Sequence, residues 1–360
     1  MRTRLVALVT LCLLLCACGA APTATIIPTS FTPAATPTPI IELLPTATPE
    51  LPTEAPPTEA PTVPPTEPPP ENLAYQYFDV SPVTGRPGRV CYNPVVVMIE
   101  ETAAARPQVN LSQADVIYEA YVEGGYTRML AVFNDNAPER VGYVRSMREV
   151  FVKMALEWDP VVVHHGRSRG AANVDVGAML NAANLRGRVD GETQANSAAI
   201  WRDPSRPATH DVLASVVQAR AKATRAPSRV RSFKFTSQKP TGAAGTEVSF
   251  KMSSKSYKYV YNAATNTYTR YLGGAEFKDN TGTTITPANV ILQTVNHRVV
   301  DSEKHVVYDA VGSGTAKVYT GGVCITATWR KDSLTARTIY YDQSGNEIAL
   351  QVGTTMIHLL

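Results

Sequence analysis

The sequence predicts an α+β fold, in which an N-terminal mixed α/β domain is followed by a smaller antiparallel β-rich domain. Between about residues 92 and 225, short apolar runs alternate with segments whose apolar residues recur at helical spacing. From about residue 230, runs rich in Tyr, Thr and Val alternate with turns that contain Gly. The expected division is a leader segment (1–17), a Pro/Thr-rich stalk (18–73), the α/β domain (74–228) and the β-rich domain (229–360).

The leader segment has the organisation of a signal peptide. Two arginines precede an apolar run from Leu5 to Ala17, which is too short to span a bilayer comfortably. The run ends in Leu15-Cys16-Ala17-Cys18, which resembles the lipobox of bacterial lipoproteins. That resemblance implies cleavage before Cys18 and acylation of its thiol, with the protein anchored to the outer face of the bacterial cell membrane. A plain secretory signal is the alternative.

The stalk is set apart by its composition. Of the 27 prolines in the chain, 16 lie between Pro22 and Pro70, together with 12 threonines, and residues 19–71 contain six Glu and no Lys or Arg. Repeated Pro-Thr and Thr-Glu units favour an extended, polyproline-like chain. We therefore expect a disordered spacer that holds the remaining residues away from the membrane, and not a cytosolic enzyme or a multi-span membrane protein.

The chain from residue 72 onward is basic, with 32 Lys and Arg against 25 Asp and Glu. Outside the cell, this balance suits an anionic cell-wall polymer, lipid headgroups or an envelope protein, and a solvated surface is the alternative. Nucleic acid is not expected as a partner, because the compartment is wrong and no binding motif occurs. Cys91 and Cys324 have no ligand spacing, so two free thiols are expected, with a disulfide as the alternative.

Strand and helix patterns are clearest in the α/β segment. The continuous apolar run from Val95 to Ile99 is typical of a strand that is buried on both faces. From Met147 to Trp158 the apolar residues recur at helical spacing, and Pro160 ends that helix. Further strands are expected at 115–122, 127–133 and 161–164, and further helices at 169–184 and 209–226.

Three hairpins are predicted in the β-rich segment, each from two alternating runs around a turn. They join 257–261 to 267–271, 317–319 to 323–327, and 338–341 to 347–352. The stretch at 227–245 is rich in Pro, Ser, Lys and Gly, which indicates a boundary between the two domains.

The first candidate cluster occupies two turn segments and comprises Glu123, Arg128, Arg145 and Arg148. Ser146 and Glu149 fit a capping box, S-x-x-E, and this structural role is the preferred interpretation of both. It would place two arginines beside a helix N-terminus, where free N–H groups and the helix dipole favour an anion. The arginines either bind an anionic ligand or pair with acids of the protein itself.

A second cluster follows the strand at 161–164. His164 ends that strand, and Gly166 to Gly170 matches G-x-S-x-G around Ser168, in the context of a nucleophile elbow. An acid and a histidine should then follow, which Asp203 and His210 satisfy in order only. A loop or N-cap role for the serine hydroxyl is the favoured interpretation.

The third cluster contains Arg202 and His210. His210 near a helix start is a candidate general acid or base, or a hydrogen-bond donor to an anion. The alternative is a surface histidine with no functional role. A metal site made of His164, Asp203 and His210 lacks recognisable ligand spacing, so neither a metal nor a cofactor is expected.

Several runs together resemble the YerB-like lipoproteins: Asn93-Pro94-Val95-Val96-Val97-Met98-Ile99, Glu123-Gly124-Gly125-Tyr126-Thr127-Arg128, Gly142-Tyr143-Val144-Arg145-Ser146-Met147-Arg148-Glu149 and Trp329-Arg330-Lys331. The resemblance covers nearly all of residues 80–358. It implies an N-terminal domain of uncharacterised function and a separate C-terminal β domain on a bacterial lipoprotein. One departure is visible, since Thr209-His210-Asp211 stands where the family usually has Pro-His-Asn.

The resulting hypothesis is an extracytoplasmic lipoprotein whose α/β domain binds an anionic envelope ligand through Arg128, Arg145, Arg148 and Arg202. An enzyme is the alternative, namely a wall-acting hydrolase that uses Glu123 with His210 or His164 as general acid and base. A non-catalytic scaffold for an envelope complex, docking through the β domain, is a further alternative.

Overall fold

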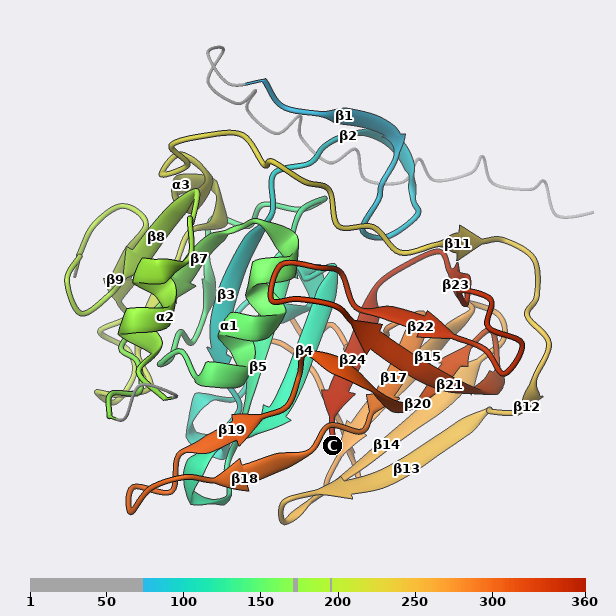
Figure 1. Ribbon diagram of the computed structural model, residues 1–360. Helices are drawn as coiled ribbons and strands as arrows, with labels where there is room; N and C mark the ends of the chain where they lie inside the picture. The colour runs from blue at the N-terminus through green and yellow to red at the C-terminus, as the bar shows by residue number, and fades with distance from the viewer. Residues whose placement is uncertain (1–73, 171–173, 195) are drawn as a thin grey trace, which may run out of the picture. The chain divides into compact units, whose positions relative to one another are not determined.

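A computed structural model describes residues 74–170, 174–194 and 196–360 (Figure 1). The leader segment, Cys18 and the stalk lie outside the described residues. The described chain is mostly strand, with few and short helices. These helices are α1 (Glu149–Ala155), α2 (Val176–Ala182), α3 (Val216–Arg220) and the 3₁₀ turns η1 (Ala103–Ala105), η2 (Leu111–Gln113), η3 (Glu123–Gly125) and η4 (Leu156–Trp158).

The largest sheet has eleven strands, drawn from both halves of the chain. Its order is β12-β21-β20-β17-β24-β4-β5-β3-β7-β8, with β22 paired to β21. The strands are β3 (Val95–Glu100), β4 (Val116–Tyr121), β5 (Thr127–Phe133), β7 (Val161–His164), β8 (Gly187–Asp190), β12 (Ala243–Ala244), β17 (Asn289–Gln293), β20 (Gly312–Thr320), β21 (Val323–Lys331), β22 (Ile339–Tyr341) and β24 (Thr355–Leu359).

Smaller sheets surround it. One has four strands, β13 (Glu247–Met252), β14 (Lys255–Asn262), β15 (Thr267–Leu272) and β16 (Ala275–Glu276). Another has β6 (Val141–Gly142), β10 (Val212–Ala214) and β9 (Ile200–Arg202). Three two-stranded ribbons are β1 (Tyr77–Val80) with β2 (Pro87–Cys91), β11 (Phe235–Thr236) with β23 (Leu350–Gln351), and β18 (His297–Val299) with β19 (Val306–Tyr308).

Strand β24 joins the two halves of the chain. It pairs in parallel with β17 on one side and with β4 on the other. The sheet therefore continues across the predicted boundary between residues 228 and 229, although β17, β20 and β21 still form an antiparallel group of their own. That residues 74–228 and 229–360 form two separate domains therefore remains a prediction.

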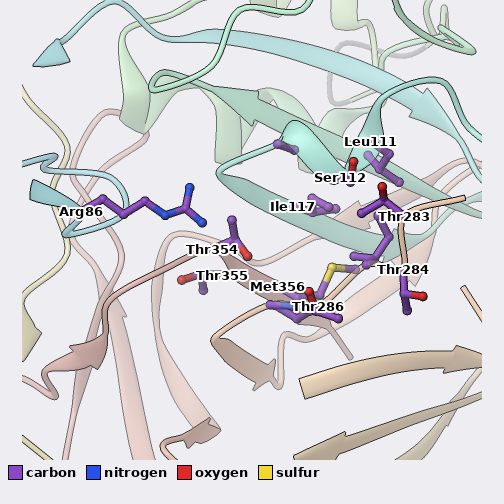
Figure 2. A pocket seen from close by; sticks show the side chains of 13 residues that line it. Arg86, Leu111, Ser112, Ile117, Thr283, Thr284, Thr286, Thr354, Thr355 and Met356 are labelled. Carbon is purple, nitrogen blue, oxygen red and sulfur yellow. The ribbon is translucent and has the colours of Figure 1, made fainter. Parts of the chain in front are cut away.

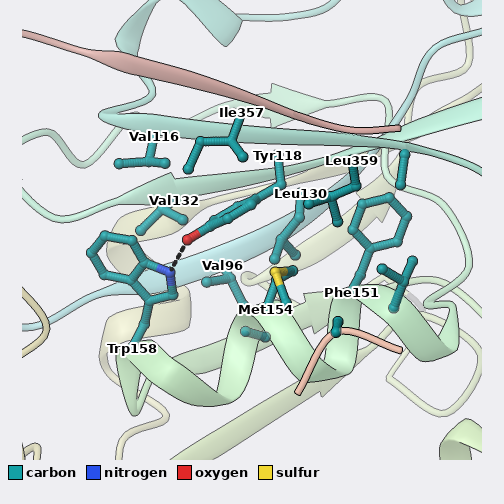
Figure 3. Packing of buried hydrophobic residues seen from close by; sticks show 14 of the residues in the cluster. Val96, Val116, Tyr118, Leu130, Val132, Phe151, Met154, Trp158, Ile357 and Leu359 are labelled. Carbon is teal, nitrogen blue, oxygen red and sulfur yellow. Dashed lines mark hydrogen bonds between the residues drawn. The ribbon is translucent and has the colours of Figure 1, made fainter. Parts of the chain in front are cut away.

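Both faces of the central sheet are buried. Within β3, Val96 and Met98 belong to one apolar cluster, whereas Val95, Val97 and Ile99 belong to another. This alternation explains why the strand reads as an unbroken apolar run. Helix α1 and the η4 turn cover the first face, where Phe151, Met154 and Trp158 pack over Tyr118 and Leu130 (Figure 3). The four-stranded sheet covers the second face through Val248, Tyr257, Tyr259 and Tyr268.

Most strand predictions are confirmed: β3, β4, β5 and β7 lie where the patterns place them, and two of the three hairpins form as β14–β15 and β20–β21. The helices are shorter than predicted. Residues 212–214 form β10 within the expected helix at 209–226. The third hairpin closes only through the bridge between Tyr341 and Glu347, because Leu350 and Gln351 pair with β11 instead.

The predicted capping box is wrong. Arg148, and not Ser146, is the N-cap of α1, and no side chain caps that end. The Glu149 carboxylate instead accepts a hydrogen bond from the backbone N–H of Tyr308 (3.2 Å) and pairs with Lys153. A partner 159 residues away in the chain has replaced the local one, which a four-residue pattern cannot reveal.

Candidate functional site

Four of the predicted site residues line one cleft of about 530 Å³ at the end of β3 and the start of β5. They are Glu123, Arg128, Arg145 and His210. The cleft is completed by Glu100, Thr102, Ala103, Ala104, Gly124, Tyr126 and Thr127. We call this site the β3–β5 cleft.

Local backbone geometry brings the charged groups of the cleft together. Glu100 is the last residue of β3 and lies directly opposite Arg128 in the antiparallel ladder with β5. The N–H of Arg145 donates to the carbonyl of Met98 (3.0 Å), which holds residue 145 beside the same strand end. Strand ends and turns thus carry the polar groups, whereas the strand interiors are apolar.

Glu100 is the centre of the hydrogen-bonding arrangement. Its side chain is 2% exposed, and its Oε1 accepts from the Thr102 hydroxyl (2.7 Å) and lies 2.9 Å from Nδ1 of His210. Its other oxygen, Oε2, lies 3.3 Å from Nε of Arg145. One buried carboxylate therefore fixes both an imidazole and a guanidinium at the wall of the cleft.

Glu123 is held by two arginines. Nε of Arg148 donates to both carboxylate oxygens at 2.8 Å, and Nη2 of Arg128 lies 3.4 Å from Oε1. Burial alone raises the pKa of Glu123, but the hydrogen bond from Arg148 and the charges of both arginines outweigh it and lower the pKa to about 2. A carboxylate with so low a pKa is a weak proton acceptor, so its geometry favours a role in orienting the arginines.

The arginines of the cleft differ in how many of their guanidinium N–H groups bind other residues of the protein. Arg128 donates from Nη1 to the carbonyl of Ser146 (2.9 Å) and from Nη2 to Glu123. Burial, followed by the charge of Arg148, lowers the pKa of Arg128 to about 9, so it remains a cation at neutral pH. Arg145 contacts Glu100 through Nε, and its two terminal nitrogens make no hydrogen bond to the described residues. Arg145 is therefore the cation best placed to receive something from the cleft.

The remaining candidates lie outside the cleft. His164 is fully buried, with Nδ1 2.8 Å from the carbonyl of Gly166 and Nε2 accepting from Nε of Arg188 (2.9 Å). Burial lowers its pKa to about 4 against the opposing charge of Asp190. The hydroxyl of Ser168 is buried and donates to the carbonyl of Val174 (2.8 Å), which is a structural role.

Arg202 also lies outside the cleft. Its Nη1 binds both carboxylate oxygens of Asp211, at 2.8 and 2.9 Å. The acid at residue 211 thus serves as an internal partner for an arginine. Among the described residues, Arg128, Arg145, Arg148 and Arg202 all have a carboxylate within 4.0 Å, so ion pairing within the protein is established for each.

Glu100 was not among the site residues predicted from the sequence. Its signal was available, because Glu100 and Glu101 directly follow the apolar run of β3, and an acid at the end of a buried strand needs a partner. Its partner is 110 residues away in the chain, so only the fold identifies His210 as that partner.

The C-terminal half supports the cleft from outside. The Lys255 ammonium donates to the Thr127 hydroxyl (3.0 Å) and to the carbonyl of Glu101 (3.2 Å), and it pairs with the Glu101 carboxylate. The Ser253 hydroxyl donates to the carbonyl of Gly125 (2.6 Å). The turn between β13 and β14 is thus fastened to the loop that carries Glu123.

A separate, smaller pocket of about 110 Å³ lies between Ser112 and the segment 283–287 (Figure 2). Threonines dominate its lining, and Arg86 reaches toward it from the β1–β2 turn. No histidine or carboxylate lines it, so it offers no acid or base group. Within the described ranges, no three His, Cys, Asp or Glu side chains are grouped to hold a metal ion, and Cys91 and Cys324 are free thiols.

Comparison with known proteins identifies the family of this chain. Residues 83–229 match the model of the DUF3048 N-terminal domain, described as a protein of unknown function, and residues 246–357 match the corresponding DUF3048 C-terminal domain. The chain belongs to the YerB-like family that these two domains define, which confirms the resemblance seen in its sequence.

One relative is a Bacillus subtilis protein named "Putative lipoprotein YerB". It is 28% identical over 251 residues, which are 66% of this chain and 73% of the relative. The crystal structure of the YerB protein from Bacillus subtilis superimposes with a TM-score of 0.67 at 26% identity, covering 78% of this chain and 96% of that one. No helix in the described part of this chain is long and apolar enough to cross a bilayer.

Proposed function

We propose that the protein is an extracytoplasmic lipoprotein, anchored by acyl chains on Cys18, whose β3–β5 cleft binds an anionic ligand of the cell envelope. The proposal rests above all on Arg145, which lines a 530 Å³ cleft and whose terminal nitrogens make no hydrogen bond to the described residues. A guanidinium presents paired N–H donors that match a carboxylate or phosphate group. Arg128 and His210 add positive or donor character to the same cleft.

The ion pairs within the protein determine the net charge of the cleft, and thereby the kind of ligand that fits it. Two carboxylates, Glu100 and Glu123, line the cleft together with two arginines, Arg128 and Arg145, and the imidazole of His210, so the formal charges of the cleft nearly balance. Selectivity would therefore come from paired hydrogen bonds to Arg145 more than from bulk charge. A ligand with one anionic group beside neutral polar groups, such as a wall fragment, fits this balance better than a polyanion.

The test compares binding of carboxylate-bearing wall fragments by wild type, Arg145→Gln and Arg298→Gln. Arg298 pairs with Asp309 on the exposed β18–β19 ribbon and serves as the matched control. We expect Arg145→Gln to weaken binding by roughly tenfold or more, as for loss of a charge-assisted hydrogen bond. Equal affinities for all three proteins would contradict the proposal.

A second candidate function, a wall-acting hydrolase, is favoured by the Glu100–His210 pair. The Glu100 carboxylate is paired with Nδ1 of His210, and Nε2 makes no hydrogen bond to the described residues, so Nε2 could accept a proton from water. The resulting hydroxide equivalent would attack an acyl or phosphoryl centre, and the proton would pass from the imidazolium to the leaving group. Arg145 would stabilise the negative charge that develops on the substrate.

Incubation of wall fragments with wild type, His210→Gln and Glu100→Gln tests this second candidate. We expect product from wild type, and a loss of about 10²- to 10⁴-fold when the base is removed. Absence of any new product at all pH values tried would rule against hydrolysis while leaving the binding proposal intact.

A further inference from the structure

A second cavity, of about 410 Å³, lies beside the C-terminal end of α2 and away from the residues of the β3–β5 cleft. We call it the α2 pocket. Its apolar lining comes from Leu156, Pro160, Met179, Ala182, Ala183, Leu185 and Leu334. Leu334 belongs to the loop between β21 and β22 and is 42% exposed.

The α2 pocket is lined by more positive than negative side chains. Asp159 is bound by Arg225 through two hydrogen bonds, at 2.8 and 2.7 Å. Burial opposes ionisation, but the hydrogen bonds from Arg225 and Ser228 lower the pKa of Asp159 to about 2, so it is a carboxylate that is already fully engaged. One acid therefore faces two arginines, Arg225 and Arg229, and the pocket carries a positive excess.

Arg229 holds that excess. Its Nη2 donates to the carbonyl of Leu156 (2.6 Å), and its Nη1 makes no hydrogen bond to the described residues. Among the described residues, no carboxylate lies within 4.0 Å of its guanidinium. The guanidinium of Arg229 therefore keeps a donor that can bind an anionic group of a ligand in the pocket.

The lining also limits the chemical class of the occupant. No aromatic ring lines the α2 pocket, so a nucleobase or other flat ring has nothing to stack on. Polar side chains are few, namely Asn184, Ser228 and Thr335 beside the charged residues, which is too sparse for a sugar. Aliphatic walls with one unpaired guanidinium are complementary to an alkyl chain that ends in a carboxylate.

We propose that the α2 pocket binds a single-chain alkyl carboxylate, with its tail against Leu156, Met179 and Leu185 and its carboxylate on Arg229. The volume of about 410 Å³ is within the range of small-molecule sites. Leu334 closes over the tail from the β21–β22 loop. This site is independent of the β3–β5 cleft and of its proposed ligand.

The test is calorimetric titration of the mature chain, produced from residue 19 onward so that it carries no acyl group, with decanoate below its micelle-forming concentration. Hexanoate and octanoate extend the series, and decanol and decyltrimethylammonium replace the carboxylate by a neutral and a cationic head. We expect one saturable decanoate site, affinity that rises by up to about fourfold per added methylene, and no binding of the cation.

Variants distinguish binding in the α2 pocket from nonspecific association of the alkyl chain with the protein surface. Arg229→Gln should weaken decanoate by about tenfold and leave decanol nearly unchanged, and Leu334→Asp should weaken both without disturbing the core, because Leu334 is exposed. Arg298→Gln should bind decanoate like wild type. No saturable binding, equal binding of decyltrimethylammonium, or an unchanged decanoate affinity in Arg229→Gln would overturn the proposal.

Discussion

The carboxylate of Glu100 and the imidazole of His210 form one hydrogen-bonded pair, with Oε1 2.9 Å from Nδ1. The two residues come from the end of β3 and from the segment that precedes β10. Because the same carboxylate also faces Arg145, a single buried acid sets the positions of the two groups that the proposed functions require. The geometry of the cleft thus depends on a residue that need not touch the ligand.

Replacing Glu100 should therefore cost stability as well as function. In Glu100→Ala, the Thr102 hydroxyl loses its buried acceptor and Arg145 loses its paired carboxylate, and we expect the free energy of unfolding to fall by about 1–3 kcal/mol. Urea titration monitored by tryptophan fluorescence measures this. Glu100→Gln keeps an acceptor oxygen and should lose less, and a Glu100→Ala variant as stable as wild type would show that the pair is incidental.

Acid should weaken the fold through Glu123. Its pKa is about 2 in the folded protein and near 4.5 in the unfolded chain, so between these values the unfolded state binds more protons. Stability from this group is complete above about pH 4.5 and is lost as the pH falls toward 2, amounting to roughly 3 kcal/mol. Urea midpoints measured from pH 7 to 2 should fall less steeply below pH 4.5 in Glu123→Gln, and parallel curves would contradict the Arg148 ion pair.

His164 should produce a separate loss at higher pH. Its pKa is about 4 in the folded state and near 6.5 in the unfolded state, because burial disfavours the imidazolium. The unfolded chain therefore takes up a proton first, and stability falls as the pH drops from 6.5 to 4. His164→Gln should flatten the stability profile in that window and leave the region below it unchanged. An unaltered slope would mean that the buried imidazole is protonated in the folded protein.

Contacts from the β13–β14 turn should keep the loop at residues 123–127 ordered. Ser253→Ala removes a hydrogen bond to Gly125, and Lys255→Met removes donors to Thr127 and Glu101. Faster amide hydrogen exchange is expected at residues 123–127 in the double variant, with little change in β20 and β21. If exchange in the loop is unaffected, the C-terminal half does not support the site.

The sequence predicts elements well where one local pattern decides the outcome. The apolar run of β3 could hardly be anything but a strand buried on both faces, and the hairpins at 255–272 and 312–331 have clear turns between alternating runs. Prediction failed where a contact with a residue far away in the sequence determines the structure. Glu149 does not cap its helix, because its carboxylate binds the backbone N–H of Tyr308. Strand β24 pairs with strands from both halves of the chain, which no local pattern indicates.

The candidate site shows the same limit. Glu123 and Arg128 lie just before and at the start of β5, and Arg145 lies after β6. Because polar residues at strand ends tend to form sites, their convergence could be predicted from the sequence. The pairing of Glu100 with His210 could not, because nothing in either segment indicates the other. His164 and Ser168 carried attractive motifs, yet burial and local hydrogen bonds engage both within the fold.

Ligand binding by Arg145 can be observed by NMR through the arginine Nε–H signals of wild type, with Arg145→Gln used for assignment. Upon addition of carboxylate-bearing wall fragments, we expect a saturable shift of the Arg145 signal, a smaller shift for Arg128 and none for Arg298. If the Arg145 signal does not move while the fragments bind elsewhere, or if they do not bind, Arg145 is not part of a ligand site.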